Sequence, residues 1–266
     1  NIHWEMQFIN RGKTDWLEWC LGNEKQMRNF PLDKGLPSLN YIVKNWPRTK
    51  CILKKYILSN HKQPDLYSIA IICLKELKVF KLKDYKSIIR KLSKLCVRNT
   101  CFNTYHDSHH FKSVLIISCI LGRQINLKYK DRLLLVIIAL THDMNHQGRR
   151  ILTSKPYYQE LKSYDGLEKI LYKKIFNFRE LMRIKRIFEN TFFPVKPENV
   201  EDDLEKIILD ADILPSLMFG PQVGVQLAGR LKQEIRYNDD SELLFSNFLK
   251  LLEGKCLYLD YAKKSC

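Results

Sequence analysis

The sequence Tyr105-His106-Asp107-Ser108-His109-His110 places two histidines four residues apart, and an apolar run, Leu133 to Leu140, leads into Thr141-His142-Asp143-Met144-Asn145-His146. If the first segment is helical, His106 and His110 lie above one another on the same face. The apolar run predicts a buried helix that ends at the second cluster. Imidazole and carboxylate groups are the ligands that hold a zinc-like ion in catalytic sites. The two segments therefore predict a helical protein with a metal site.

Helical periodicity extends over most of the chain. Apolar residues recur at three- and four-residue intervals, as at Ile88, Leu92 and Leu95, whereas alternating strand patterns are scarce. The prediction is an all-α fold, a compact multi-helix domain whose metal site lies in a central helical pocket. The segment Pro194 to Pro197 predicts a break between two helices. The expected helices are Lys13–Leu21, Leu39–Lys44, Lys50–Leu58, Leu66–Leu77, Asp84–Cys96, Tyr105–Leu121, Lys130–Thr141, Tyr164–Phe176, Phe178–Asn190, Val200–Phe219, Val223–Tyr237 and Ser241–Leu251.

No linker divides the sequence, so we expect residues 1–266 to form a single helical domain. Residues 1–100 contain no clustered ligand set and are expected to form an N-terminal packing subdomain. Residues 101–266 contain the candidate ligands and the C-terminal helices, and are expected to carry the chemistry. The chain begins with Asn1 rather than Met, which suggests that it is trimmed from a longer protein.

The composition favours a soluble, cytoplasmic protein that prefers anionic partners. The 45 basic and 29 acidic residues give a net charge of +16, but the lysines are dispersed and form no long arginine-rich block. A small anionic substrate is therefore expected, and nucleic-acid binding is not favoured. The eight cysteines include no Cys-x-x-Cys pair, which fits reduced thiols in a core. The longest apolar run has eight residues, far fewer than the roughly 20 that a membrane-spanning helix needs.

The first histidine cluster suggests two different roles for its members. If Asn103 or Thr104 caps the helix, His110 sits one turn deeper than His106. His110 would then be a metal ligand, and the more exposed His106 a proton donor, a role for which the ordinary pKa of histidine is well suited. Taken alone, the segment also fits a polar helix start at the surface.

The second and third clusters supply carboxylates. Burying His142 and Asp143 at the end of an apolar helix is unfavourable unless the two side chains are paired or bind a metal. The two oxygens of Asp143 could bridge two cations, and His146 could reach the second cation or orient the proton donor. Asp210 and Asp212 are two positions apart on an expected helix, so only one of them is expected to face the metals.

Together the clusters resemble the HD superfamily of metal-dependent phosphohydrolases, whose pattern is a distant His, then His-Asp, then a later Asp. A closer likeness is to the catalytic domain of class I 3′,5′-cyclic nucleotide phosphodiesterases. That family opens with Tyr-His-Asn-x-x-His-Ala-x-Asp-Val, where this chain has Tyr105-His106-Asp107-Ser108-His109-His110-Phe111-Lys112-Ser113-Val114. The family continues with His-Asp-x-x-His-Pro-Gly and Ala-Asp-Leu-Ser, where this chain has His142-Asp143-Met144-Asn145-His146-Gln147-Gly148 and Ala211-Asp212-Ile213-Leu214. The resemblance covers roughly Cys101 to Tyr237.

The resemblance implies a metal-dependent phosphodiesterase of signal transduction, which hydrolyses cAMP or cGMP to the nucleoside 5′-monophosphate. It implies that His110, His142, Asp143 and Asp212 hold a tightly bound Zn²⁺, and that Asp143 also reaches a second ion, Mg²⁺ or Mn²⁺. A hydroxide between the two metals would attack phosphorus. His106 would act as the general acid on the leaving ribose oxygen.

The chain also departs from the family. Gln147 replaces the proline of the second motif, and Ile151 replaces a later asparagine. Of an expected Glu-Asn-His-His segment only Glu168 remains, which could polarise a metal-bound water or be a solvated acid. No counterpart of the purine-binding glutamine stands near the C terminus. Phe245 and Phe248 could stack on a base, although core packing is the alternative for each.

These departures leave several alternatives open. The candidate substrate contacts are Tyr105, Glu168, Phe245 and Phe248. The Ala-Asp pair makes Asp212 the preferred last ligand, with Asp210 as the fallback. The alternative functions are another HD-type nucleotide phosphohydrolase with the same metal site, and a catalytically degenerate relative that binds nucleotide or nucleic acid.

Overall fold

The computed structural model describes residues 39–58, 63–148, 155–172, 174–192, 200–252 and 257–266. This part of the chain is helical and contains no β-strand beyond one isolated bridge between Tyr172 and Phe176. The predicted all-α fold is therefore confirmed for the described residues. The helices are α2 (Leu39–Lys44), α3 (Lys50–Ile57), α4 (Leu66–Glu76), α5 (Leu82–Asn99), α6 (Ser108–Gln124), α7 (Tyr129–Thr141), α8 (Tyr158–Leu171), α9 (Phe178–Asn190), α10 (Asp203–Met218), α11 (Pro221–Ile235), α12 (Ser241–Leu252) and α13 (Asp260–Lys263).

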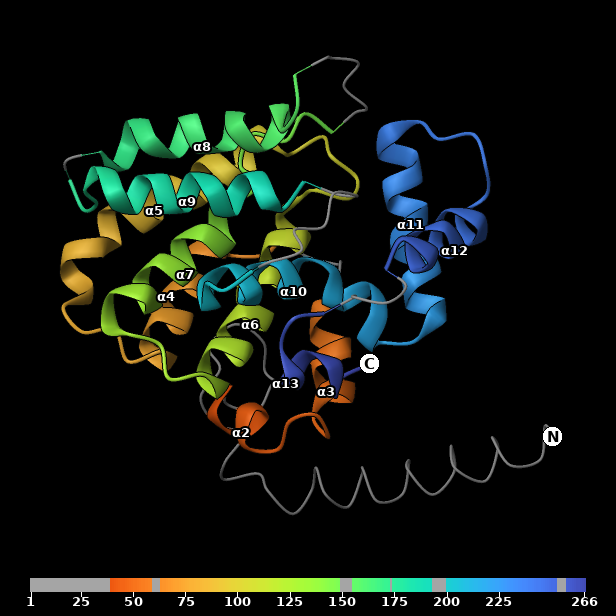
Figure 1. The fold of residues 1–266 in the computed structure, drawn as a ribbon, viewed down its shortest axis with the longest axis horizontal. Coiled ribbons are helices and arrows are strands. Elements are labelled where there is room, and N and C mark those ends of the chain that lie inside the picture. Colours follow the sequence, from red (N-terminus) through yellow and green to blue (C-terminus); the bar gives the residue numbers. More distant parts are fainter. Residues whose placement is uncertain (1–38, 59–62, 149–154, 173, 193–199, 253–256) are drawn as a thin grey trace.

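Helices α6 and α7 lie at the centre of the fold (Figure 1). The side chains of α6 are buried from His110 to Gly122, and those of α7 from Leu133 to Thr141. A helix that is apolar on all sides is stable only when other elements surround it. Helices α4, α7 and α10 all pack on α6, and α10 also contacts α7. This packing brings the first turn of α6, the end of α7 and the middle of α10 together.

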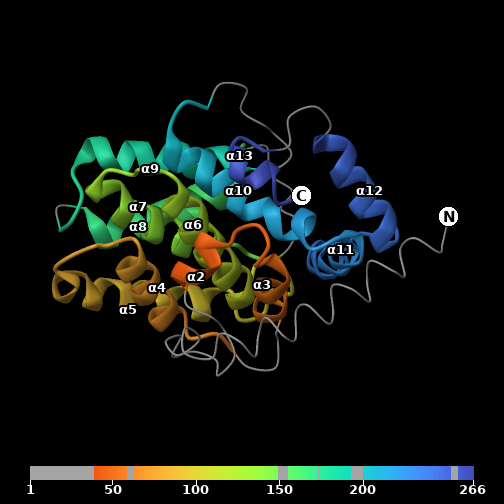
Figure 2. The ribbon, with the colours of Figure 1, turned by 90° about the horizontal axis from the view of Figure 1, so that it is seen from below.

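The remaining helices cover this centre (Figures 1 and 2). Helices α8 and α9 lie side by side, as do α4 and α5, and α11 packs between α10 and α12. No helix in the described ranges is both long enough and apolar enough to cross a membrane. The cysteines in these ranges, Cys51, Cys73, Cys96, Cys101, Cys119 and Cys266, are free thiols.

Most predicted helix boundaries differ from the observed ones by a few residues, but the start of α6 changes the site. Helix α6 begins at Ser108, not at Tyr105 as predicted. The reason is the Asp107 carboxylate, which accepts hydrogen bonds from the backbone N–H groups of His109 and His110 at 2.9 and 3.1 Å. A short acidic side chain at this position caps the helix, and because the capping residue itself is not helical, the helix begins at the next residue.

The predicted caps Asn103 and Thr104 are therefore wrong, and both residues have another role. The side-chain amide of Asn103 donates to the backbone carbonyl groups of His106 and His146. The hydroxyl of Thr104 donates to the carbonyl oxygen of Arg230 in α11. These bonds tie the segment before α6 to the end of α7 and to α11.

Two other predictions differ from the structure, and two cannot be compared with it. Helix α8 begins at Tyr158 rather than at Tyr164, directly after Tyr157, whose φ of 55° is left-handed. Helix α13 was not expected. The predicted helix Lys13–Leu21 and the predicted break at Pro194–Pro197 lie outside the described residues.

Candidate metal centre

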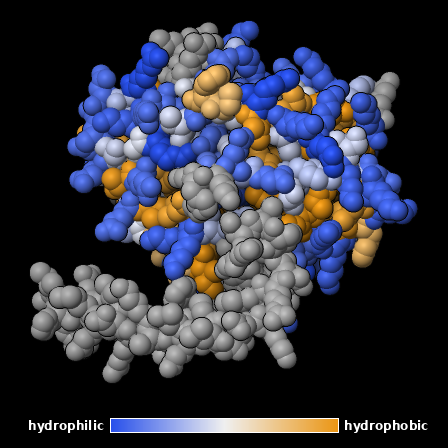
Figure 3. Space-filling view, turned by 180° about the vertical axis from the view of Figure 1, so that it is seen from behind, coloured by the Kyte–Doolittle hydropathy of each residue, from blue (hydrophilic) through white to orange (hydrophobic). Residues whose placement is uncertain are grey.

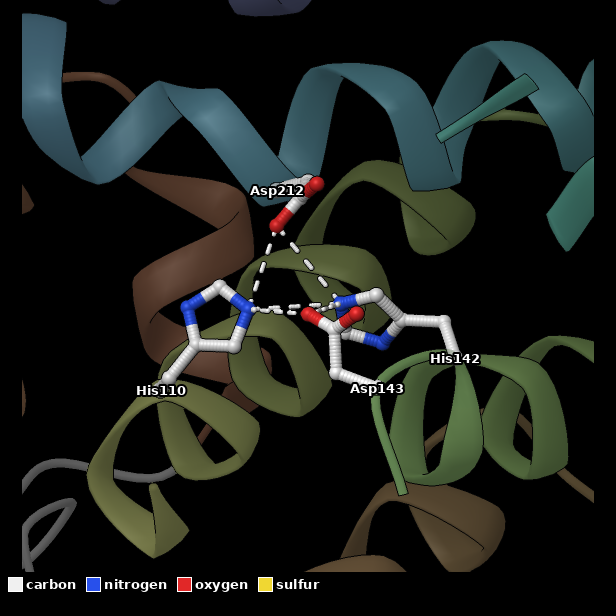
Figure 4. Close-up of side chains that lie close together, drawn as sticks. All are labelled: His110, His142, Asp143 and Asp212. Carbon is white, nitrogen blue, oxygen red and sulfur yellow. Dashed lines mark hydrogen bonds and ion pairs between the residues drawn. The ribbon is translucent and has the colours of Figure 1, made fainter. Parts of the chain in front are cut away.

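Four side chains from three helices converge at the centre of the fold (Figure 4). His110 stands in the first turn of α6, and His142 and Asp143 directly follow the last residue of α7. Asp212 comes from the middle of α10. The His142 side chain is fully buried, whereas 21% of the Asp212 side chain is exposed. The centre is therefore enclosed on the α7 side and open next to α10.

The spacing of the four ligand atoms fits one metal ion. Nε2 of His110 lies 3.3 Å from Nε2 of His142, 3.3 Å from Oδ2 of Asp143 and 3.1 Å from Oδ1 of Asp212. Nε2 of His142 lies 3.1 and 3.5 Å from the same two oxygens. Four atoms placed tetrahedrally about 2.0–2.1 Å from one zinc-like ion are roughly 3.3 Å apart. This group of ligand atoms, all within 4.8 Å of one another, could hold such an ion.

The charges of the group compensate one another. Burial lowers the pKa of His110, but hydrogen bonds with Asp143 and Asp212 outweigh burial and raise this pKa to about 9. Burial also lowers the pKa of His142, but the negative charge of Asp143 outweighs burial and raises this pKa well above its usual value. Burial raises the pKa values of the two carboxyl groups, and the histidines lower both below the usual range. A metal ion bound here would therefore displace the protons that the two histidines share with the two carboxylates.

Asp212, and not the fallback Asp210, lies in this group. Asp210 is fully buried, and its carboxylate accepts hydrogen bonds from the backbone N–H groups of Tyr258 at 2.9 Å and Leu259 at 2.8 Å. Residues two positions apart on a helix point about 200° apart, so the two carboxylates face different neighbours. Asp210 holds the C-terminal segment, which leaves Asp212 as the fourth candidate ligand.

His106 lies beside the four ligands but precedes α6, so the prediction that it shares a helix face with His110 is wrong. The centres of the two rings are nevertheless 5.4 Å apart. Nε2 of His106 lies 4.0 Å from Oδ2 of Asp143, and its side chain is 17% exposed compared with 6% for His110. The predicted difference in depth between the two histidines is therefore present, although the helix does not produce it.

Glu234 of α11 fixes His106 and was missed in the sequence. Its Oε1 lies 2.5 Å from Nδ1 of His106, and its Oε2 accepts hydrogen bonds from the backbone N–H groups of Tyr105 and His106. Burial raises the pKa of Glu234, but the hydrogen bond from His106 outweighs burial and lowers this pKa to about 2. No motif marks Glu234, because it stands in an ordinary helical pattern far along the chain from His106.

His146 packs against His106. The two rings are stacked, with their centres 3.7 Å apart and their planes 28° apart. Burial, and then the charge of His106, lower the pKa of His146 to about 3, so His146 is neutral at neutral pH. Both ring nitrogens of His146 have other partners: Nδ1 accepts a hydrogen bond from the backbone N–H of Gly148 at 3.2 Å, and Nε2 lies 3.0 Å from the side-chain amide nitrogen of Gln159. Although ligand atoms of His106, His146 and Glu234 lie close together, the group therefore fits a supported proton donor better than a second cation.

On α8, Glu160 lies near enough to the centre for the charge of Asp143 to affect it, whereas Glu168 is bonded elsewhere. Glu168 accepts a hydrogen bond from the Tyr164 hydroxyl at 3.0 Å. Oε2 of Glu160 is buried without a hydrogen-bond partner among the described residues. Burial, and less strongly the charge of Asp143, raise the pKa of Glu160 to about 7. Sequence reasoning missed Glu160 because the predicted helix began after it.

The remaining candidates for substrate contacts lie in two places. Tyr105 lies at the centre, with its ring 5.4 Å from that of His110. Phe245 and Phe248 stack on each other within α12, with ring centres 6.2 Å apart. Phe245 also packs against Gly224 of α11, where an added Cβ would lie 2.2 Å from its ring. Phe245 is thus part of the contact between α11 and α12, as the core-packing alternative predicts.

The arrangement combines a space for a divalent cation, a histidine beside it that can donate a proton, and an acid on α8 with one buried carboxylate oxygen. No known protein family, no curated protein and no solved structure significantly matches this chain.

Proposed function

We propose that this chain is a metal-dependent phosphodiesterase that hydrolyses a 3′,5′-cyclic nucleotide, cAMP or cGMP, to the nucleoside 5′-monophosphate. The observation that carries the proposal is the convergence of His110, His142, Asp143 and Asp212 on one space of the size of a zinc ion. Zn²⁺ there, with Mg²⁺ or Mn²⁺ beside Asp143, would polarise the phosphoryl group and lower the pKa of a bound water.

His106 is proposed as the proton donor to the leaving group. Glu234 accepts a hydrogen bond from Nδ1 of His106, so Nε2 faces the candidate cation space, 4.0 Å from Oδ2 of Asp143. As the bond between phosphorus and the ribose 3′-oxygen breaks, the proton on Nε2 passes to that oxygen. The negative charge of Glu234 stabilises the protonated ring before the transfer, and the neutral ring of His146 supports it from the other side.

Glu160 is proposed as the proton acceptor. An attacking water must lose a proton as its oxygen bonds to phosphorus. Glu160 has a buried carboxylate oxygen without a partner in the described part of the chain, near enough to Asp143 to be affected by its charge. A carboxylate with a pKa near neutrality is suited to receive this proton.

The choice of a cyclic nucleotide rests on the motif resemblance and on the excess of positive charge, which favours an anionic substrate. The test is elemental analysis of the purified chain together with a hydrolysis screen over cyclic and linear nucleotides. We expect bound zinc, conversion of cAMP or cGMP to the 5′-monophosphate, and loss of activity with a strong chelator. Hydrolysis of linear nucleotides alone would favour the other HD-type reaction. Bound metal without any hydrolysis would favour the non-catalytic relative.

Asp212→Asn tests the ligand set, with Asp203→Asn as the matched control. Both residues stand on α10, but the Asp203 side chain, in the first turn, is 55% exposed. We expect Asp212→Asn to lose metal and turnover, because an amide is a poor replacement for an anionic zinc ligand. Asp203→Asn should keep both. Full metal content and turnover in Asp212→Asn would refute the proposed site.

A further inference from the structure

Helix α5 carries positive charge along one side. It contains six basic residues and one acidic residue, which gives the helix a net charge of +5. At 100° per residue, the six fall within about 140° of the helix circumference, and the buried Ile89, Leu92 and Cys96 lie outside that arc. We call these six exposed residues the basic band: Lys83, Lys86, Arg90, Lys91, Lys94 and Arg98.

The basic band is not neutralised within the described part of the chain, where none of its members forms an ion pair with a carboxylate. Arg90 instead stacks over the ring of Tyr67, 4.6 Å from its centre. The arginines of α9 differ, because Arg183 pairs with both Asp131 and Asp202 at 2.6 Å. Part of the excess positive charge of the chain thus lies on α5 without compensation by carboxylates of the described residues.

Exposed phenylalanines stand at both ends of α5. Phe80, just before the helix, is 66% exposed, and Phe102, just after it, is 96% exposed. Phe80 is held outward by Tyr129, whose ring stacks on it and whose hydroxyl bonds both its backbone N–H and its carbonyl oxygen at 2.9 Å. Helix α5 lies on the far side in Figure 1, which Figure 3 shows as mostly hydrophilic with scattered hydrophobic side chains.

We propose that α5 binds the surface of an anionic lipid membrane and lies parallel to it. A helix of 18 residues is about 27 Å long, so the basic band can meet several lipid headgroups at once. Each basic residue near such a surface strengthens binding about fivefold. The phenyl rings of Phe80 and Phe102 enter the interface between headgroups and acyl chains, where aromatic side chains are favourable. This inference does not depend on the proposed catalytic function.

A membrane fits these features better than a nucleic acid does. The basic band lies on the exposed, convex side of a single helix, and a broad, flat surface can contact such a side along its length. Base stacking requires open ring faces, and Tyr129 covers one face of Phe80, so only the ring of Phe102 is open on both faces. One such ring at the end of the helix offers no platform for successive bases. A lipid surface takes up both the charges and the rings.

The test is co-sedimentation of the full chain with phosphatidylcholine vesicles, with and without about a third phosphatidylserine. We expect binding only to the anionic vesicles, and its loss between about 0.1 M and about 1 M salt. Lys86→Glu, Arg90→Glu and Lys94→Glu together should lower the partition coefficient by about 100-fold or more. Phe102→Ala should lower it by about tenfold, because a buried phenyl group is lost.

The matched control makes the same charge change with Lys250→Glu on α12, Lys263→Glu on α13 and Lys264→Glu directly after it. These lysines are exposed, and α12 and α13 lie away from α5 in Figures 1 and 2. The control variant should keep most of the vesicle binding. Circular dichroism spectra of all variants show whether the helices are intact. Equal loss in both triple variants would overturn the proposal, because net charge alone would then explain binding. Binding of single-stranded RNA through α5, without vesicle binding, would overturn it in favour of a nucleic-acid partner.

Discussion

Replacing Glu234 by glutamine isolates the electrostatic support of His106, since it removes one charge and almost no volume. The carboxylate accepts hydrogen bonds from the backbone N–H groups of Tyr105 at 2.7 Å and His106 at 2.9 Å, and from Nδ1 of His106 at 2.5 Å. The glutamine oxygen can still accept from the backbone. Its amide group, however, faces the imidazole N–H as a second donor.

The magnitude follows from the lowered pKa of Glu234. A lowering from 4.5 to about 2 corresponds to about 3 kcal/mol of stabilisation. The Glu234 side chain is fully buried and that of His106 is 17% exposed, so solvent screens the interaction only weakly. Because the pKa in the folded state lies below that in the unfolded state, the contribution is complete above about pH 4.5. It is lost as the pH falls from about 4.5 to about 2.

Urea unfolding of the wild type and Glu234→Gln from pH 7 down to pH 3 measures this contribution. We expect the variant to be less stable by about 2–3 kcal/mol at pH 7, with a difference that shrinks below pH 4.5. Glu242→Gln, at an exposed position of α12, is the control and should change stability by no more than about 0.5 kcal/mol. Equal stability of Glu234→Gln and wild type at pH 7, or a difference that grows in acid, would refute this reasoning.

Three further substitutions separate fold from chemistry. Asp210→Asn should lower the free energy of unfolding by about 1–3 kcal/mol, because the C-terminal segment loses a charged acceptor; zinc loss at unchanged stability would contradict this structural role. Gly224→Ala should lower it by about 1–3 kcal/mol, since the new Cβ would lie 2.2 Å from Phe245 and 2.8 Å from the carbonyl oxygen of Ser216; a higher melting temperature would argue against close packing there. His106→Ala should keep metal by elemental analysis while turnover falls about 10²–10⁴-fold; loss of metal would make His106 a ligand.

The position of the second cluster could be predicted from the sequence because hydrophobic burial determines it. The run Leu133 to Leu140 is apolar on all sides, so it must be enclosed, and the structure buries it completely. His142 and Asp143 then come at the inner end of a central helix. The prediction needed only the length of the run and the polarity of the residues directly after it.

The start of α6 could not be predicted in the same way, because several residues there are able to cap a helix. Asn103, Thr104 and Asp107 all have short polar side chains that can accept a free backbone N–H. The contacts of Asn103 with the end of α7 and of Thr104 with α11 decide the choice, and these partners are distant in sequence. Local preference alone leaves the three equivalent.

The supporting acids were missed for a related reason. A ligand histidine is recognised by its spacing from a second ligand, but Glu234 and Glu160 have no such partner nearby in the sequence. Their roles arise from tertiary placement: Glu234 of α11 bonds the segment before α6, and Glu160 of α8 lies within the influence of the charge of Asp143. Only the helix arrangement distinguishes them from solvated acids on ordinary helices.

The pair Asp210 and Asp212 shows how one helix can serve the fold and the site together. Burying the Asp210 carboxylate is unfavourable unless its oxygens are bonded, and in the observed rotation of α10 the N–H groups of Tyr258 and Leu259 donate to them. That rotation directs Asp212 toward His110, 3.1 Å away. A turn of α10 by one residue, about 100°, would leave Asp210 without its partners and withdraw Asp212 from the histidines. The buried acid thus holds the proposed ligand in place.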